Sequence, residues 1–346
     1  MTRPAPAGHS GSSPRPLRLG TRRSRLATTQ SGWVADKLRA LGHEVELVEV
    51  VTEGDVNLAP LTQIGGTGVF ASALRQALRA GEVDLAVHSL KDLPVLPEPG
   101  LVVAAIPERE DPRDVLVARD GLDLAGLPAG ASVGTGSPRR AAQVLVHRPD
   151  LQVTAIRGNV ESRIRRTTTG ELDAVILAGA GMRRLGLAEQ ITDVIDVDVM
   201  LPAPGQGALA VECRESDTEV IEVVRALDHE ATRTAVTAER ALLRALEAGC
   251  TAPIGARAHL EAGELVLEAF AGSDDGSIAL RRRATGDPQD PLRLGSSLAA
   301  ELLTDGADRI PASVLARTPT HTPPSGDPDG RTRSPRDTGA IKEQTP

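Results

Sequence analysis

The most constraining feature of this sequence is a regular alternation of short apolar segments with longer amphipathic ones. Segments of strand length with helices between them are typical of βαβ units, which build parallel sheets. A break at residues 108–113 divides the pattern into two series, so we expect two α/β domains. Strands are predicted at residues 17–20, 45–50, 84–89 and 101–106, and then at 114–118, 131–134, 151–156 and 173–178.

The remaining sequence predicts a third, smaller unit. The apolar segment 208–213 could return to the first sheet, and residues 216–248 form two helices. Three strand-like stretches and a helix at 291–304 then indicate an α+β domain. The predicted limits are 17–110 plus 205–226 for domain 1, 111–204 for domain 2 and 227–312 for domain 3, with disordered tails at 1–16 and 313–346.

Composition excludes several classes of protein. The formal net charge of −8 argues against a nucleic-acid partner, whose phosphates favour a basic face. Two cysteines make no disulfide scaffold, which favours a reducing compartment. There is no secretory signal, no apolar run of membrane-spanning length, and no CxxC or HExxH motif. We therefore expect a soluble, cytoplasmic protein without a metal site or a membrane partner.

An arginine-rich stretch stands out in this acidic chain. Residues 131–166 contain seven arginines but only two acids, Asp150 and Glu161. Arg139 and Arg140 lie in the first turn of a predicted helix, after a glycine-rich turn at 134–137. Cations are misplaced at that end of a helix unless an anion offsets them. The stretch predicts a carboxylate-binding site, and a solvated basic face is the alternative.

Asp92 is the candidate acid/base residue. It lies in the segment HSLKDLP (88–94), directly after a buried strand and beside Lys91. A carboxylate at a strand end can be held in a cleft and exchange protons with a substrate nitrogen. A turn residue or helix cap is the alternative interpretation.

Two further segments carry candidate chemistry. Cys250 lies in EAGCTAPIG (247–255), where the glycines and the proline indicate an irregular turn, but a structural cysteine is equally compatible with that position. The run Gly65–Phe70 resembles a phosphate loop without its Gly-Lys-Ser/Thr ending. It could carry Phe70 over a cleft or form an ordinary turn.

Taken together, these segments resemble the hydroxymethylbilane synthase (porphobilinogen deaminase) family over about residues 17–312. The matching elements occur in one order, so their agreement is not fortuitous. They are TRRS (21–24), GD (54–55), GGTGVF (65–70), AVHSLKDLP (86–94), EREDPRD (108–114), GTGSPRR (134–140), RGNV (157–160), LPAPGQG (201–207), GC (249–250) and PIG (253–255).

The resemblance implies an α/β fold with two domains like those of periplasmic binding proteins and an active-site cleft between them. A smaller α+β domain carries the cofactor cysteine. The implied cofactor is dipyrromethane, attached to Cys250 through a thioether. The implied enzyme is a monomeric transferase that condenses four porphobilinogen molecules with loss of ammonia, then releases linear hydroxymethylbilane by hydrolysis.

The resemblance also assigns roles to individual residues. Asp92 assists loss of ammonia and stabilises the cationic azafulvene that results. The cofactor is bound by Cys250, Arg139, Arg140, Lys91, Ser137, Thr135, Arg163 and Arg184. The substrate is bound by Arg22, Ser24, Arg157, Phe70 and Ser89. The chain departs from the family pattern at Gln63 and Thr67, which replace loop lysines, and at Gly136, which replaces a serine.

Two rival functions explain part of the sequence. A non-catalytic anion-binding module would account for two α/β domains and the arginines, but not for Cys250 in a third domain. A thiol enzyme would need a histidine partner for Cys250, and His147, His229 and His259 lie in no recognisable context.

Overall fold

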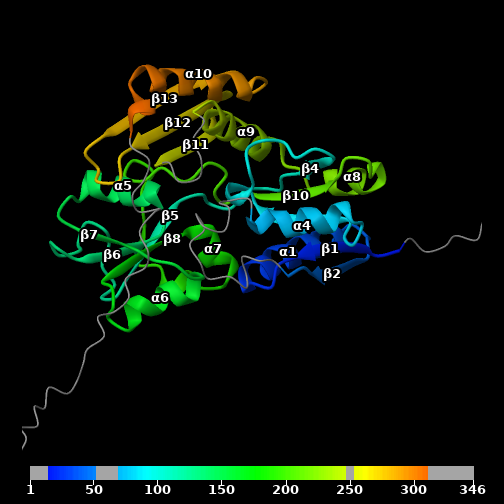
Figure 1. Cartoon of the computed structure of the whole chain (residues 1–346), viewed down its shortest axis with the longest axis horizontal. Coiled ribbons are helices and arrows are strands. Elements are labelled where there is room, and N and C mark those ends of the chain that lie inside the picture. The colour runs from blue at the N-terminus through cyan, green and yellow to red at the C-terminus, as the bar shows by residue number, and fades with distance from the viewer. Residues whose placement is uncertain (1–14, 52–68, 247–252, 311–346) are drawn as a thin grey trace, which may run out of the picture.

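The computed structural model describes residues 15–51, 69–246 and 253–310, which form three sheets with their helices (Figure 1). Two sheets have five strands each and the third has three. They follow one another along the chain, apart from one strand that returns to the first sheet. The predicted class, two α/β units and a smaller α+β unit, is confirmed.

The first sheet has the strand order β2-β1-β3-β10-β4. β1 pairs in parallel with β2 and β3, as βαβ units require. β10 returns from the second unit and pairs antiparallel with both β3 and β4. The predicted return of residues 208–213 is therefore correct. The strands are β1 (Leu17–Thr21), β2 (Val45–Glu49), β3 (Leu85–Ser89), β4 (Leu101–Ala105) and β10 (Leu209–Arg214).

The second sheet repeats this plan in the order β7-β6-β8-β5-β9. β6 is parallel to β7 and β8, whereas β5 runs antiparallel to β8 and β9. The predicted parallel pairing therefore holds for part of each sheet, and both sheets are mixed because β5 and β10 enter them from the neighbouring unit. The strands are β5 (Asp114–Ala118), β6 (Ser132–Thr135), β7 (Gln152–Ala155), β8 (Ala174–Ala178) and β9 (Asp193–Val194).

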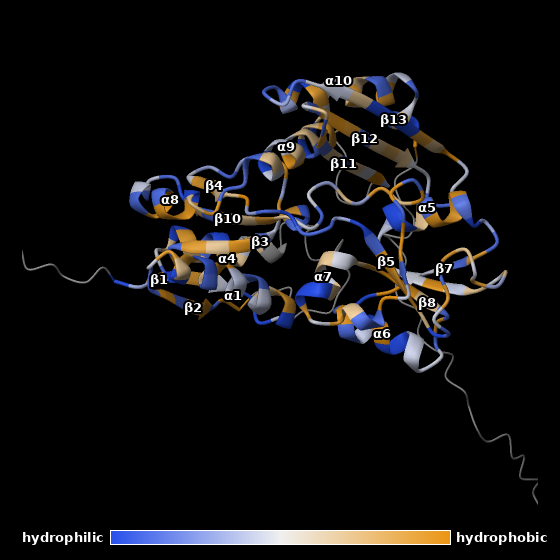
Figure 2. Ribbon diagram, turned by 180° about the vertical axis from the view of Figure 1, so that it is seen from behind, coloured by the Kyte–Doolittle hydropathy of each residue, from blue (hydrophilic) through white to orange (hydrophobic). Residues whose placement is uncertain are grey.

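Helices cover these sheets and bury aliphatic side chains against them. Figure 2 shows helices with mixed faces around more hydrophobic strands. Ser24 caps the first helix as predicted, since its hydroxyl accepts from the backbone N–H of Ala27. No helix in the described ranges is long and apolar enough to cross a membrane. The helices are α1 (Arg25–Ala40), α4 (Val69–Arg79), α5 (Pro138–His147), α6 (Val160–Thr168), α7 (Gly179–Arg184) and α8 (Thr218–Arg225).

The third unit packs two helices on an antiparallel sheet. Its strands β11 (Ile254–Glu261), β12 (Glu264–Gly272) and β13 (Ala279–Gly286) pair in chain order. Helices α9 (Glu230–Ala245) and α10 (Pro291–Thr304) approach so closely that a Cβ on Gly295 would lie 2.4 Å from the Ala238 carbonyl oxygen. A side chain at position 295 would force the helices apart.

A buried glutamate joins this unit to both segments that cross between the first two sheets. The Glu239 carboxylate lies on α9 and is fully buried. It accepts from Arg109 Nη1 at 2.6 Å and from the backbone N–H of Gly205 at 2.6 Å. It also accepts from the N–H of Ala258 in β11 at 2.8 Å. The third unit is thereby fixed to the linkers at residues 109 and 205.

Candidate active site

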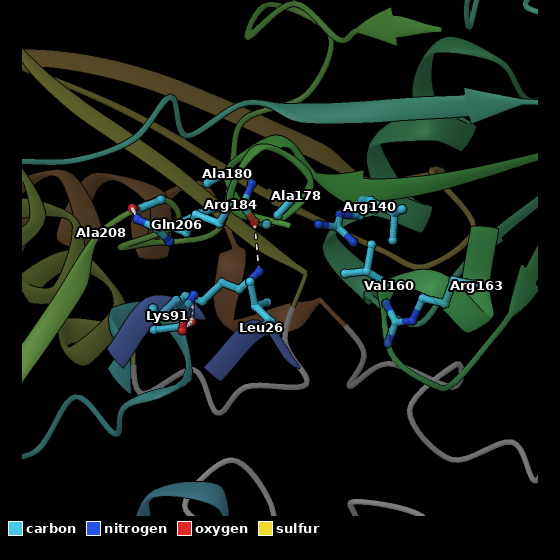
Figure 3. Close-up of a pocket in the computed structure, with 15 residues that line it drawn as sticks. Leu26, Lys91, Arg140, Val160, Arg163, Ala178, Ala180, Arg184, Gln206 and Ala208 are labelled. Atoms are coloured by element: carbon cyan, nitrogen blue, oxygen red, sulfur yellow. Dashed lines mark hydrogen bonds between the residues drawn. The ribbon is translucent and has the colours of Figure 1, made fainter. Parts of the chain in front are cut away.

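A cavity lies where the first and second sheets meet (Figure 3). The strands β3 and β8 end at this edge, and β10 and β5 begin there, because Leu209 pairs with Ser89 and Asp114 with Ala178. Ligands of open α/β sheets bind at such carboxyl ends. The cavity is lined by Leu26, Gln30, Ser89, Lys91, Arg140, Val160, Arg163, Leu177, Ala178, Ala180, Gly181, Arg184, Gln206, Gly207 and Ala208.

The described lining of this cavity is rich in cations. Lys91, Arg140, Arg163 and Arg184 all contribute to it, whereas no aspartate or glutamate does among the residues that the structure describes. Figure 3 shows Arg140 and Arg163 from the second unit on one side and Lys91 from the first on the other. Charges that are partly removed from water require a counter-charge. The cavity is therefore suited to a ligand that carries several carboxylates.

Arg139 and Arg140 share a single buried carboxylate. Asp114 is fully buried, and its oxygens accept from Arg139 Nη1 at 2.7 Å and from Arg140 Nε and Nη2 at 3.0 and 2.8 Å. Burial alone would raise the pKa of the Asp114 carboxyl, but the two guanidinium groups hold it well below its usual range. Two cations on one anion leave a net positive charge beside the cavity.

The two arginines differ in their access to the cavity. Arg140 lines it and also donates to the Ile176 carbonyl at 3.0 Å. Arg139 is not among the lining residues, and its Nη1 donates to the Leu201 carbonyl at 2.6 Å. Within the described ranges the buried Arg139 Nε has no hydrogen-bond partner. Within those ranges, one N–H donor of the arginine pair therefore has no acceptor.

Burial disfavours the charged forms of the other cavity cations. It lowers the pKa of Lys91 to about 8, against an opposing effect of the Asp92 carboxylate. It also lowers the pKa of Arg163 to about 10, assisted by repulsion from Arg140, and lowers the pKa of Arg184. A bound anion would reverse these shifts, because an opposite charge favours the protonated form.

Hydrogen bonds to neutral oxygens orient these cations without neutralising them. Lys91 Nζ donates to Gln206 Oε1 at 3.3 Å. Arg163 Nε donates to the Gly158 carbonyl at 2.9 Å, and Arg184 Nη2 donates to the Gly207 carbonyl at 2.7 Å. The charge of each therefore remains available to a ligand.

Asp92 lies at the edge of this group of cations. It belongs to a short 3₁₀ helix, η2 (Leu90–Asp92), that follows β3 directly. Its side chain is exposed, and it is not among the lining residues of the cavity. Its carboxylate nevertheless favours the charged forms of Lys91 and of Arg163 on α6, so it faces the second unit. An exposed carboxylate between cations can both exchange protons with water and face a bound ligand.

The predicted hydroxyl residues occupy different positions. Ser89 lines the cavity and bonds to Gln30 at 3.0 Å. Ser24 caps α1, and Thr135 Oγ1 accepts from the Ser137 N–H at 3.2 Å. Ser137 precedes α5 as its N-cap, but its side chain makes no capping bond.

Four other predicted residues complete the comparison with the sequence. Arg157 lies close enough to Arg163 to help lower the pKa of the Arg163 guanidinium. Arg22 lies outside the cavity lining. Phe70 is in the first turn of α4. Cys250 lies outside the described residues, as do Gln63 and Thr67 of the loop.

Sequence reasoning missed Gln206 and Asp114 as parts of the site. Gln206 Nε2 donates to Asp114 at 2.8 Å and to the Pro112 carbonyl at 2.7 Å, so this amide joins Lys91 to the arginine pair. An acid at the start of the apolar strand DVLVA was the available signal for Asp114. For Gln206 the signal was its place between Gly205 and Gly207, which both have positive φ.

Among the described residues, no three His, Cys, Asp or Glu side chains gather in a way that could hold a metal ion.

The fold and the site define an α/β protein of two larger units and a smaller third one, with a cationic cavity where the first two sheets meet. A family model described as porphobilinogen deaminase, dipyromethane cofactor binding domain, matches residues 17–222. A second, described as porphobilinogen deaminase, C-terminal domain, matches residues 233–304. The chain belongs to the porphobilinogen deaminase family of transferase enzymes. The predicted family and the predicted dipyrromethane cofactor are thereby confirmed.

Relatives cover almost the whole folded part of the chain. Porphobilinogen deaminase of Thermobifida fusca is 55% identical over 311 residues, covering 87% of this chain and 97% of the relative. Porphobilinogen deaminase 1 of Streptomyces coelicolor is 55% identical over 305 residues, covering 84% and 96%. Among solved structures, a substrate binding domain of a putative molybdenum ABC transporter from Clostridium difficile has a TM-score of 0.41 at 13% identity, covering 63% of this chain and 93% of that one.

The lowered pKa of Lys91 gives a direct test of the site. The sequence has three lysines, Lys37, Lys91 and Lys342, so their ¹³C-labelled side chains can be assigned by NMR. In protein that carries no cofactor, we expect one signal to titrate near pH 8 and to be missing in Lys91→Arg. Asp92→Asn should move that midpoint to lower pH, because the carboxylate favours the charged amine. A midpoint above pH 10 for Lys91 would contradict this description of the cavity.

Proposed function

We propose that this chain joins four porphobilinogen molecules, with loss of ammonia from each, on a dipyrromethane attached to Cys250, and then releases linear hydroxymethylbilane by hydrolysis. The observation that carries the proposal is a cavity lined by Lys91, Arg140, Arg163 and Arg184 and, within the described residues, by no acid, with Asp92 directly following Lys91 in η2. Each pyrrole unit has an acetate and a propionate side chain. A growing chain of such units brings the carboxylates that this cavity lacks.

The residues present fit the cofactor. A dipyrromethane carries four carboxylates, which match planar guanidinium groups and an ammonium. Arg139 binds Asp114 through Nη1, and its Nε, which is without a partner in the described ranges, is one more donor. We assign cofactor binding to Lys91, Thr135, Ser137, Arg139, Arg140, Arg163 and Arg184, and substrate binding to Arg22, Ser24, Phe70, Ser89 and Arg157.

Asp92 is proposed to handle the proton and the developing charge. When bound, the dipyrromethane supplies the pyrrole carbon to which the substrate is joined. The Asp92 carboxylate would accept a hydrogen bond from a pyrrole N–H and stabilise the positive charge that develops as ammonia leaves. It would then accept the proton released as the new carbon–carbon bond forms. Its exposed position lets it return that proton to water.

Attachment at Cys250 is supported by the described residues that follow it. The chain continues from Pro253 into β11, where the Ala256 N–H donates to the Pro202 carbonyl at 2.9 Å. The adjacent Leu201 carbonyl accepts from Arg139. The segment that follows the cysteine is therefore bonded to residue 202, and the adjacent residue 201 is bonded to Arg139, which in turn binds Asp114.

The protein is further proposed to act as a cytoplasmic monomer, without a nucleic-acid or membrane partner. The net charge of −8 supports the absence of a nucleic-acid partner. Cys213 supports a reducing compartment, since burial raises the pKa of its thiol to about 12 and keeps it unreactive. All residues assigned to the cofactor site belong to one chain, so the proposed site needs no second copy.

Intact-mass measurement tests the attachment. The purified protein should be heavier than its polypeptide by the mass of two linked pyrroles, and Cys250→Ser should lose that increment. Cys213→Ser is the matched control, because it changes the other cysteine of the chain and should keep the adduct. A bare polypeptide mass in every preparation of the wild type would instead favour an anion-binding module.

Asp92→Asn tests the acid/base assignment. The substitution keeps the shape of the side chain and removes its charge. We expect the cofactor adduct to remain while kcat falls by roughly 10²–10⁴-fold, the usual contribution of a positioned acid/base group. Steady-state assays normalised to the adduct-loaded fraction provide the measurement, and turnover near that of the wild type would exclude Asp92 from this role.

A further inference from the structure

The loop that carries Asp92 is held by an arginine from the third unit. Arg240 on α9 reaches the segment 90–94 and, among the described residues, bonds to its backbone alone. Nη1 donates to the Leu90 carbonyl at 3.2 Å and to the Leu93 carbonyl at 2.9 Å. Nη2 donates to the Pro94 carbonyl at 2.5 Å. One planar group thus ties together three carbonyls on both sides of Asp92.

Arg240 contrasts with the arginines that bind buried carboxylates. Arg75 and Arg109 bind the buried carboxylates Glu212 and Glu239. In the part of the chain that the structure describes, Arg240 forms no such ion pair, and it is partly buried. Burial, with repulsion from Arg75, lowers the pKa of its guanidinium to about 10. A partly buried cation that, among the described residues, bonds to a loop backbone and to no carboxylate is costly to the fold and suggests a purpose for that loop.

The backbone of this loop determines where Asp92 lies. Leu90 and Leu93 are buried and anchor the segment, whereas the Asp92 side chain between them is exposed. The 3₁₀ turn has few bonds of its own, namely Leu93 N–H to the Leu90 carbonyl and Leu90 N–H to the Ala208 carbonyl. A short turn of this kind is weak alone. Arg240 binds the same Leu90 carbonyl and extends the restraint to Pro94.

We propose that Arg240 is a positioning residue that fixes Asp92 for proton transfer by holding the carbonyls of residues 90–94. It does not contact the cavity, since it is absent from the lining. The inference rests on the proposed role of Asp92 in the condensation. Its neighbour Glu239 fixes the linkers at Arg109 and Gly205, so one turn of α9 holds both the linkers and the catalytic loop.

The test compares Arg240→Met with Arg244→Met. Arg244 lies on the same helix but is exposed, so its substitution makes the same chemical change without touching the loop. We expect Arg240→Met to lower kcat about tenfold, equivalent to about 1.4 kcal/mol, with KM within about twofold of the wild type. Arg240→Lys should recover part of the loss, and Arg244→Met should match the wild type. All rates are taken per adduct-loaded molecule.

A double-mutant comparison separates positioning from general destabilisation. If Arg240 acts through Asp92, Arg240→Met should add little to the loss of single-turnover rate already caused by Asp92→Asn. An equal fractional loss in both backgrounds would overturn the proposal, as would an unchanged kcat in Arg240→Met.

Arg240→Lys keeps the proposal testable if Arg240→Met does not fold. It retains the charge but not the planar fork, so a folded Arg240→Lys with full kcat would contradict a positioning role. Failure of the proposed function would appear differently, as a wild type that has neither an adduct nor turnover.

Discussion

The site depends on one carboxylate that is shared by two guanidinium groups. Asp114 is fully buried at the start of β5 and orients both Arg139 and Arg140. A buried ion pair is costly unless its remaining hydrogen-bonding groups are satisfied, and Gln206 supplies that additional bond. Asp114 with its two arginines still carries one excess positive charge. The other cations of the cavity lining add to this excess, and a ligand with several carboxylates would balance it.

The topology explains why that charge lies between the domains. β5 and β10 enter their sheets antiparallel, and each begins opposite the end of a parallel strand. The linkers that precede them therefore run along the cleft. They place Asp114 and Gln206 at the same edge as η2 with Asp92. Glu239 then binds both linkers from the third unit, so one helix connects that unit to the cleft.

Much of the fold could be predicted from local patterns, because helix periodicity and capping depend on near neighbours. The helix at 291–304 has the predicted limits. Strand direction could not be predicted, since it depends on partners that are distant in sequence. The central role of Asp114 could not be predicted for the same reason. The sequence shows it only as the first residue of an apolar strand, whereas its partners are Arg139, Arg140 and Gln206. The contact of Arg240 with residues 90–94 spans 150 positions and leaves no local signal.

Proton uptake on binding tests most directly whether ligand carboxylates neutralise the cavity. Porphobilinogen can be titrated calorimetrically into Cys250→Ser at pH 8, in two buffers with different ionisation enthalpies. Lys91 is then partly neutral, and a bound carboxylate should raise its pKa, so binding should take up as much as about half a proton. Binding should also weaken with added salt. Binding without proton uptake and without salt dependence would contradict the account.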